Sequence, residues 1–134
     1  MNFKHAQDRN KLVLHRDVIH QIESVDVGLL LAQIIYALPA DSNLSLRVWK
    51  QLKASLNDKY RFHQDYGRFL ALKNPGILFE PELNLDVTAL LADLSRNELL
   101  FLQWDGEIEC DTLYFLSREH GIKLSIKHIS HIIL

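Results

Sequence analysis

The chain has 134 residues, 48% of them hydrophobic, and a formal net charge of −2 at pH 7. This length and composition fit a single domain with an apolar core over residues 1–134, with a polar N-terminal extension at 1–10. The balanced charge excludes an overall basic field that would attract nucleic acid. The single cysteine, Cys110, excludes an internal disulfide and is typical of a reducing compartment.

No segment of the sequence has the pattern of a secretion signal or a membrane span. The first ten residues are polar and charged, unlike a signal peptide. The longest apolar run, 25–38, contains Asp26 and Gln33 and is too short to span a bilayer. We therefore expect a cytoplasmic protein with no membrane partner.

The first half of the chain predicts two strands followed by two helices. Short apolar runs at 11–14 and 24–27 are typical of strands. The segment 28–38 is apolar nearly all round and ends at a proline, which predicts a buried helix. Apolar residues three and four apart predict another helix over 44–57. Residues 58–67 have the composition of a loop or a frayed helix end.

The second half predicts a helix between two strands, and then a group of C-terminal strands. The strand at 69–72 breaks at Lys-Asn-Pro-Gly, and a helix follows over 85–94. Residues 98–104 form the best strand pattern in the chain and end at an Asp-Gly turn signal. Further strands are predicted at 112–116 and within 122–134.

This alternation of strands and helices predicts an α/β fold with a mainly parallel sheet. The central strand at 99–102 is apolar on both sides, which predicts helices on both faces of the sheet. The last strands are candidates for an antiparallel C-terminal edge.

The common catalytic and metal-binding motifs are absent from the sequence. It has no glycine-rich phosphate loop, Gly-x-Ser-x-Gly, Cys-x-x-Cys or His-Glu-x-x-His. Cys110 lies among carboxylates, a setting unlike that of a catalytic cysteine. His128 and His131 stand three apart and would converge on a metal only in a helical tail. We therefore expect no cofactor and no metal, and the sequence favours a protein that is not an enzyme.

Three side chains at the ends of elements are candidate functional contacts. Lys73 follows the strand at 69–72, where α/β proteins bind ligands. Asp105 follows the strand at 98–104, and its simpler interpretation is the first residue of a turn. Arg96 is a candidate phosphate or carboxylate contact, and its simpler interpretation is a solvated arginine at a helix end.

A local basic segment favours nucleic acid as an alternative partner. Residues 47–61 carry five basic side chains against one acid, Asp58. A nucleic-acid interface there would use these five, with an affinity that falls as salt rises: Arg47, Lys50, Lys53, Lys59 and Arg61.

Residues 77–108, ILFEPELNLDVTALLADLSRNELLFLQWDGEI, carry a more specific pattern. Its elements, in order, are Leu78-Phe79-Glu80, Leu83, Leu85-Asp86, Leu94-Ser95-Arg96-Asn97 and Trp104-Asp105-Gly106. This order resembles the small P-loop ATPases of type-3 BREX bacteriophage-defence systems, the BrxF family, and a weaker likeness covers most of 10–110. The resemblance implies a P-loop-NTPase-like fold and partners among other defence proteins.

The departures from that family fall in its phosphate site. The phosphate loop should follow the strand at 11–14, where this chain has His15-Arg16-Asp17 and lacks the loop and its helix. The acids that hold Mg²⁺ should fall at Lys73 and Gly76, and a lysine would repel the metal. The resemblance therefore implies a degenerate P-loop-like subunit.

The function predicted from the sequence is that of a non-catalytic subunit of a BREX-like antiviral defence assembly. It would act through protein contacts and reach DNA through the assembly, and its oligomeric state stays open. The alternatives are a nucleic-acid-binding adaptor that uses the basic residues of 47–61, and a small nuclease or toxin with an unrecognised site.

Overall fold

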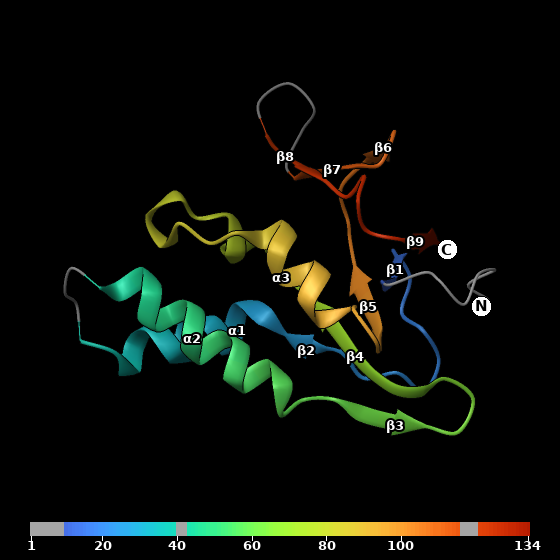
Figure 1. Cartoon of the computed structure of the whole chain (residues 1–134), viewed down its shortest axis with the longest axis horizontal. Coiled ribbons are helices and arrows are strands. Elements are labelled where there is room, and N and C mark those ends of the chain that lie inside the picture. The colour runs from blue at the N-terminus through green and yellow to red at the C-terminus, as the bar shows by residue number, and fades with distance from the viewer. Residues whose placement is uncertain (1–9, 40–42, 116–120) are drawn as a thin grey trace.

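The computed structural model describes residues 10–39, 43–115 and 121–134 (Figure 1). The helices in these ranges are α1 (Val27–Ala37), α2 (Leu44–Asn57) and α3 (Val87–Leu94). Two short 3-10 helices, η1 and η2, precede α3 at Gly76–Phe79 and Pro81–Leu83. The strands are β1 (Lys11–His15), β2 (Val25–Asp26), β3 (Arg61–His63), β4 (Gly67–Lys73), β5 (Leu99–Gln103), β6 (Ile108–Glu109), β7 (Thr112–Phe115), β8 (Ile122–Ser125) and β9 (His131–Ile133).

The main sheet is largely parallel, so the predicted α/β class is confirmed. Its strand order is β2-β4-β5-β1-β9, and β5 lies at the centre with β1 and β4 on its two sides. β3 pairs antiparallel with β4 and lies on the same edge of β4 as β2. In the described residues no helix has both the length and the apolarity needed to cross a membrane.

The C-terminal strands do not form the predicted antiparallel edge of this sheet. β9 pairs with β1 in parallel, with Leu12 opposite His131. The antiparallel strands β6, β7 and β8 form a separate small sheet. Parallel neighbours need a long crossover connection, and this small sheet lies within the crossover from β5 to β9. The predicted strand at 112–116 ends at Phe115 in the described residues, and position 116 lies outside them.

The three helices of the described ranges all lie on one face of the main sheet, which corrects the expectation of helices on both faces (Figure 1). The connections from β2 to β4, from β4 to β5 and from β5 to β9 run in the same direction across the strand order. Right-handed crossovers therefore place them on one face. Only the connection from β1 to β2 runs the other way, and its residues 16–24 contain no helix.

The side chains of the central strands alternate between two apolar clusters. Under the helices lie six leucines, each at most 1% exposed: Leu12, Leu14, Leu70, Leu72, Leu100 and Leu102. The helix-free face holds a smaller cluster of Val13, Ile22, Phe69, Ala71 and Phe101. In that cluster Phe101 makes edge-on ring contacts with Tyr66 and Phe69 at centroid distances of 5.4 and 5.9 Å. The β1–β2 connection, through Ile22, takes the place of a helix here.

Two local predictions also change in the structure. Residues 61–63, predicted as loop or frayed helix, form β3 because they pair with β4. The helix predicted over 85–94 begins at Val87, because the Asp86 carboxylate caps it by accepting a hydrogen bond from the backbone N–H of Ala89 at 3.0 Å.

Candidate functional site

The carboxyl ends of the parallel strands meet at one edge of the main sheet, where open α/β sheets bind their ligands. We call this the carboxyl edge. Arg16 follows β1, Lys73 ends β4, and Trp104 and Asp105 follow β5. The structure thus brings two of the predicted contacts, Lys73 and Asp105, to the same edge.

A hollow of about 250 Å³ opens at the carboxyl edge beyond β4 and β5. The Phe79 and Phe115 rings stack beside it at a centroid distance of 5.3 Å, and Phe79 meets the Trp104 ring edge-on at 5.9 Å. The residues that line it are Asn74, Pro75, Gly76, Trp104, Asp105, Gly106 and Phe115. This lining is mainly apolar and aromatic, with one carboxylate.

The chemistry of this hollow suits a small flat group better than a phosphate chain. Trp104 is 2% exposed, and its indole N–H has no hydrogen-bond partner among the described residues. A ligand oxygen would satisfy that donor. A triphosphate would instead meet the Asp105 carboxylate, and two negative groups at short range repel each other.

At this edge the Asp26 side chain has a structural role as the N-cap of α1. Its Oδ1 atom accepts hydrogen bonds from the backbone N–H of Leu29 and from the Asn74 side chain, each at 3.0 Å. The bond from Leu29, then the bond from Asn74, and more weakly the charge of Lys73, lower the pKa of the Asp26 carboxyl. This carboxylate therefore caps α1. Asp26 also ends β2, as the predicted strand at 24–27 implies. Sequence analysis did not identify its second role as a helix cap, although an aspartate before an apolar helix is a capping signal.

Lys73 lies opposite Asp26 in the register of β4 and β2, and it is exposed. Its ammonium group therefore faces solvent beside a carboxylate that is already hydrogen-bonded.

Arg16, which follows β1, reaches across the carboxyl edge to the loop after β5. Its guanidinium group donates hydrogen bonds of 2.8 Å to the backbone carbonyls of Asp105 and of Gly106. The side-chain amide of Gln103 in turn donates to the Arg16 carbonyl at 3.1 Å. The side chain that follows β1 is thus used to hold the loop after β5. Sequence analysis gave no signal for it, because the partners are about ninety positions away in the chain.

Arg96 lies at the opposite, amino edge of the sheet, since it precedes β5. It is separated from Lys73 and Asp105 by the length of a strand, about 17 Å for five residues. Its guanidinium group pairs with Asp93 at 3.0 Å. Asp93 also forms an ion pair with the Lys53 ammonium group at 3.0 Å. The structure therefore joins Arg96 to the basic residues of α2.

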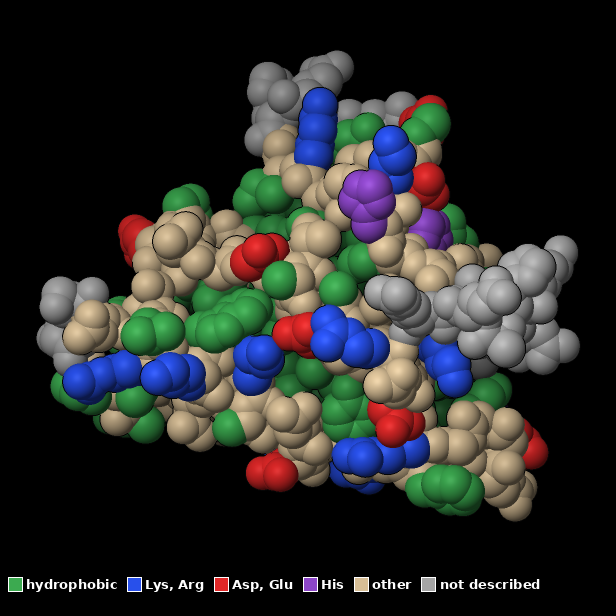
Figure 2. Space-filling model, in the orientation of Figure 1, with side chains coloured by type: hydrophobic (Ala, Val, Ile, Leu, Met, Phe, Trp, Pro, Cys, Tyr) green, Lys and Arg blue, Asp and Glu red, His purple; other side chains and the backbone are tan. Residues whose placement is uncertain are grey.

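The predicted nucleic-acid contacts do not all share one surface. Arg47, Lys50 and Lys53 stand three residues apart on α2 and share one of its faces. Lys59 is exposed beyond the helix end. Arg61 lies opposite Phe69, which belongs to the helix-free face, and approaches Glu23 at 3.9 Å. Figure 2 shows Lys and Arg side chains in a row over α2 and toward α3.

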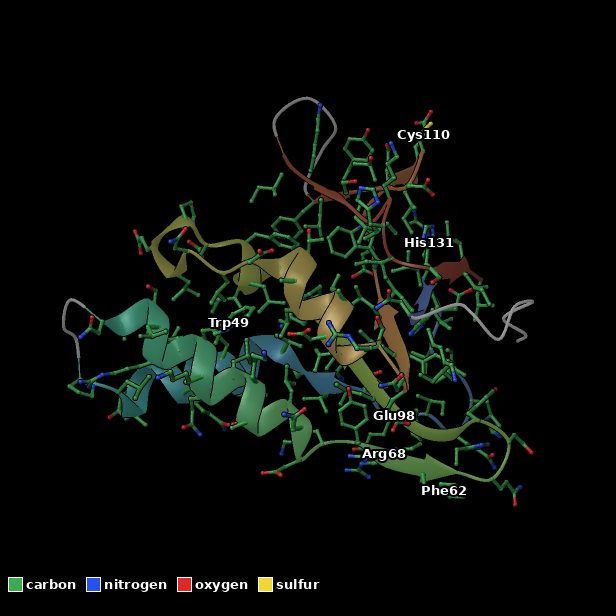
Figure 3. The ribbon with its side chains drawn as sticks, viewed as in Figure 1. Trp49, Phe62, Arg68, Glu98, Cys110 and His131 are labelled. Carbon is green, nitrogen blue, oxygen red and sulfur yellow. The ribbon has the colours of Figure 1, made fainter. Side chains whose placement is uncertain are left out.

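The C-terminal residues that the structure describes include Cys110, His128 and His131, which lie apart from one another in function. No three His, Cys, Asp or Glu side chains of the described ranges are placed to hold a metal ion. His128 is exposed, and His131 contacts Asp111 at 3.2 Å. Cys110 is exposed at the tip of the β6–β7 turn (Figure 3).

The fold and this edge together define a small α/β protein with a mainly parallel sheet and a carboxyl edge closed by Arg16. The chain matches no family model, no curated protein and no solved structure. The likeness to the BREX ATPases therefore depends on the sequence pattern, chiefly that of residues 77–108.

Proposed function

We propose that the chain is a non-catalytic, P-loop-like subunit of a BREX-like phage-defence assembly that acts through protein contacts. Three observations support this proposal: the sequence pattern of 77–108, the mainly parallel sheet, and a β1–β2 connection without glycine or helix. A fold that keeps its core without its phosphate chemistry fits a binding role.

A fourth observation, the outer face of α1, carries the part of the proposal that concerns protein contacts. None of the eleven residues of this helix is charged. Leu29 is 59% exposed and Tyr36 is 94% exposed, and their seven-residue spacing puts them on one face of the helix. Exposed apolar and aromatic side chains on an uncharged helix are typical of a protein interface.

A hollow of about 400 Å³ beside this face adds room for a partner side chain. It is lined by Leu30, Gln33, Ile34, Ala37, Leu38 and Gln51, from α1, from the residue after it and from α2. The lining has no charge, so the occupant we propose is an apolar segment of another subunit. A membrane surface fits less well, because α1 lacks the basic residues that interfacial helices carry.

We expect Tyr36→Glu together with Leu29→Glu to break the complex between this protein and the products of its neighbouring genes. The change places two charges in a contact that must exclude water, while both side chains are exposed in the single chain. Light scattering after co-expression measures the complex. Val18→Glu is the matched control, since Val18 is 79% exposed and lies outside α1. The proposal would be contradicted if the complex survives the double substitution, if Val18→Glu breaks it as well, or if the partner is a second copy of this chain.

We expect the isolated protein to bind no Mg-ATP in isothermal titration. Arg16 is engaged by the Asp105 and Gly106 carbonyls, and the edge offers a carboxylate where a phosphate would lie. Micromolar affinity would overturn the non-catalytic part of the proposal and leave the α1 contact standing. The nuclease or toxin alternative stays a prediction without a supporting contact in the described residues.

A further inference from the structure

The helix-covered side of the molecule carries a row of cations that runs from α2 to the amino edge of the sheet. We define the basic strip as Arg47, Lys50, Lys53, Arg96 and Arg68. The first three rise along α2 over about 9 Å, at 1.5 Å per residue. The strip continues through Asp93 to Arg96, and Figure 2 shows the row across this face.

Two carboxylates enclosed by the strip are paired with its cations. Asp93 lies 3.0 Å from both Lys53 and Arg96, and Glu98 lies 4.0 Å from Arg68. All three are solvent-accessible ion pairs, and such pairs contribute little to stability. These paired cations can therefore turn to a phosphate at small cost.

Aromatic rings hold two of these cations in place. The Lys53 ammonium lies 5.4 Å from the Trp49 ring centroid, and the Arg68 guanidinium lies 4.8 Å from that of Tyr60. Both rings are half-buried against the core. A cation that is already positioned loses less freedom when it binds an anion.

An exposed aromatic ring lies at the Arg68 end of the strip. Phe62 of β3 is directly opposite Arg68 of β4 in the antiparallel register, so the two side chains share a face. Phe62 is 78% exposed. Figure 3 shows Phe62, Arg68 and Glu98 following one another from β3 across β4 to the start of β5. An exposed ring beside a row of cations is the arrangement with which proteins stack a base and hold its backbone.

We propose that this surface binds single-stranded nucleic acid, with phosphates on the basic strip and a base stacked on Phe62. The site is distinct from the α1 face and from the carboxyl edge. It also replaces the interface predicted from the sequence: Arg96 and Arg68 join the α2 cations, and Arg61 is turned away.

Fluorescence anisotropy with a labelled oligothymidylate of 20 nucleotides, measured over a salt series, tests the proposal on the full chain. Neutralising five phosphates of a single strand gives a slope of log affinity against log salt of about −3.5, at about −0.7 per phosphate. We expect Lys50→Ala with Arg96→Ala to reduce the slope by about 1.4. The matched control, Lys123→Ala with Lys127→Ala, removes the same charge from exposed positions near the small sheet and leaves the slope unchanged.

Phe62→Ala separates base stacking from simple charge attraction. Loss of one stacked base should weaken oligothymidylate binding about 5- to 150-fold with an unchanged salt slope. Binding to a duplex of equal length should not change. The proposal is overturned if the oligothymidylate does not bind at 50 mM salt, or if polyglutamate binds more tightly than the oligothymidylate. It is also overturned if the control pair Lys123→Ala with Lys127→Ala reduces the salt slope equally, or if Phe62→Ala leaves the affinity unchanged. A thermal melt of each variant confirms that it is folded.

Discussion

Phe101→Ala is expected to lower the free energy of unfolding by about 3–5 kcal/mol, the usual range for a fully buried phenylalanine. Phe101 is 0% exposed at the centre of the helix-free face. Its ring makes edge-on contacts with Tyr66, Phe69 and His15 at centroid distances of 5.4, 5.9 and 6.2 Å. Because these partners come from different segments, no single neighbour can move in to fill the space.

Urea unfolding measures this effect, and Phe62→Ala is its control. Phe62 is 78% exposed, so the same substitution there should change stability by about 0.5 kcal/mol or less. A loss below about 1 kcal/mol for Phe101→Ala would mean that the β1–β2 connection repacks onto the sheet. That result would contradict the inference that the stability of the helix-free face depends on the aromatic cluster around Phe101.

Gly106→Ala is expected to destabilise the protein by about 1–3 kcal/mol, the range for overpacking a filled site. A Cβ atom at this position would lie 2.0 Å from the carbonyl oxygen of Tyr114 and 2.9 Å from the indole nitrogen of Trp104. The backbone cannot yield freely, because Arg16 holds the Gly106 carbonyl at 2.8 Å and the Tyr114 N–H bonds to the Glu107 carbonyl at 2.9 Å.

Thermal melting and Trp104 fluorescence together measure the change, since a shift at Gly106 moves the surroundings of the indole. Gly76→Ala is the matched comparison from the same hollow. Its Cβ would meet the end of the Phe115 ring at 2.7 Å, and a side chain can turn aside more easily than a carbonyl. We therefore expect a smaller loss at Gly76. Equal melting temperatures for Gly106→Ala and the unmodified protein would show that the loop after β5 is not fixed by Arg16.

The three surfaces discussed above use different parts of the fold. The carboxyl edge is occupied by Arg16 and carries the aromatic hollow. The uncharged face of α1 is proposed to bind a partner subunit, and the basic strip runs from α2 to the amino edge. Because each proposal has its own substitutions and its own control, failure of one leaves the others testable.

The sequence by itself determined the elements whose signals are local. Apolar residues three and four apart placed α2, and the apolar run before a proline placed α1, because helix periodicity is set by neighbouring residues. The strands β1, β4 and β5 followed from short apolar runs in the same way. The lack of a glycine-rich loop after β1 is also a property of the sequence alone.

Only the tertiary structure decided which distant residues meet and on which face they lie. Arg16 reaches the carbonyl of Asp105, and Lys53 shares Asp93 with Arg96, through contacts whose partners no local pattern specifies. The order of the strands fixed the direction of each crossover, and the right-handed rule then placed all three described helices on one face. Periodicity reports which side of an element is buried, whereas strand order and handedness determine what covers it.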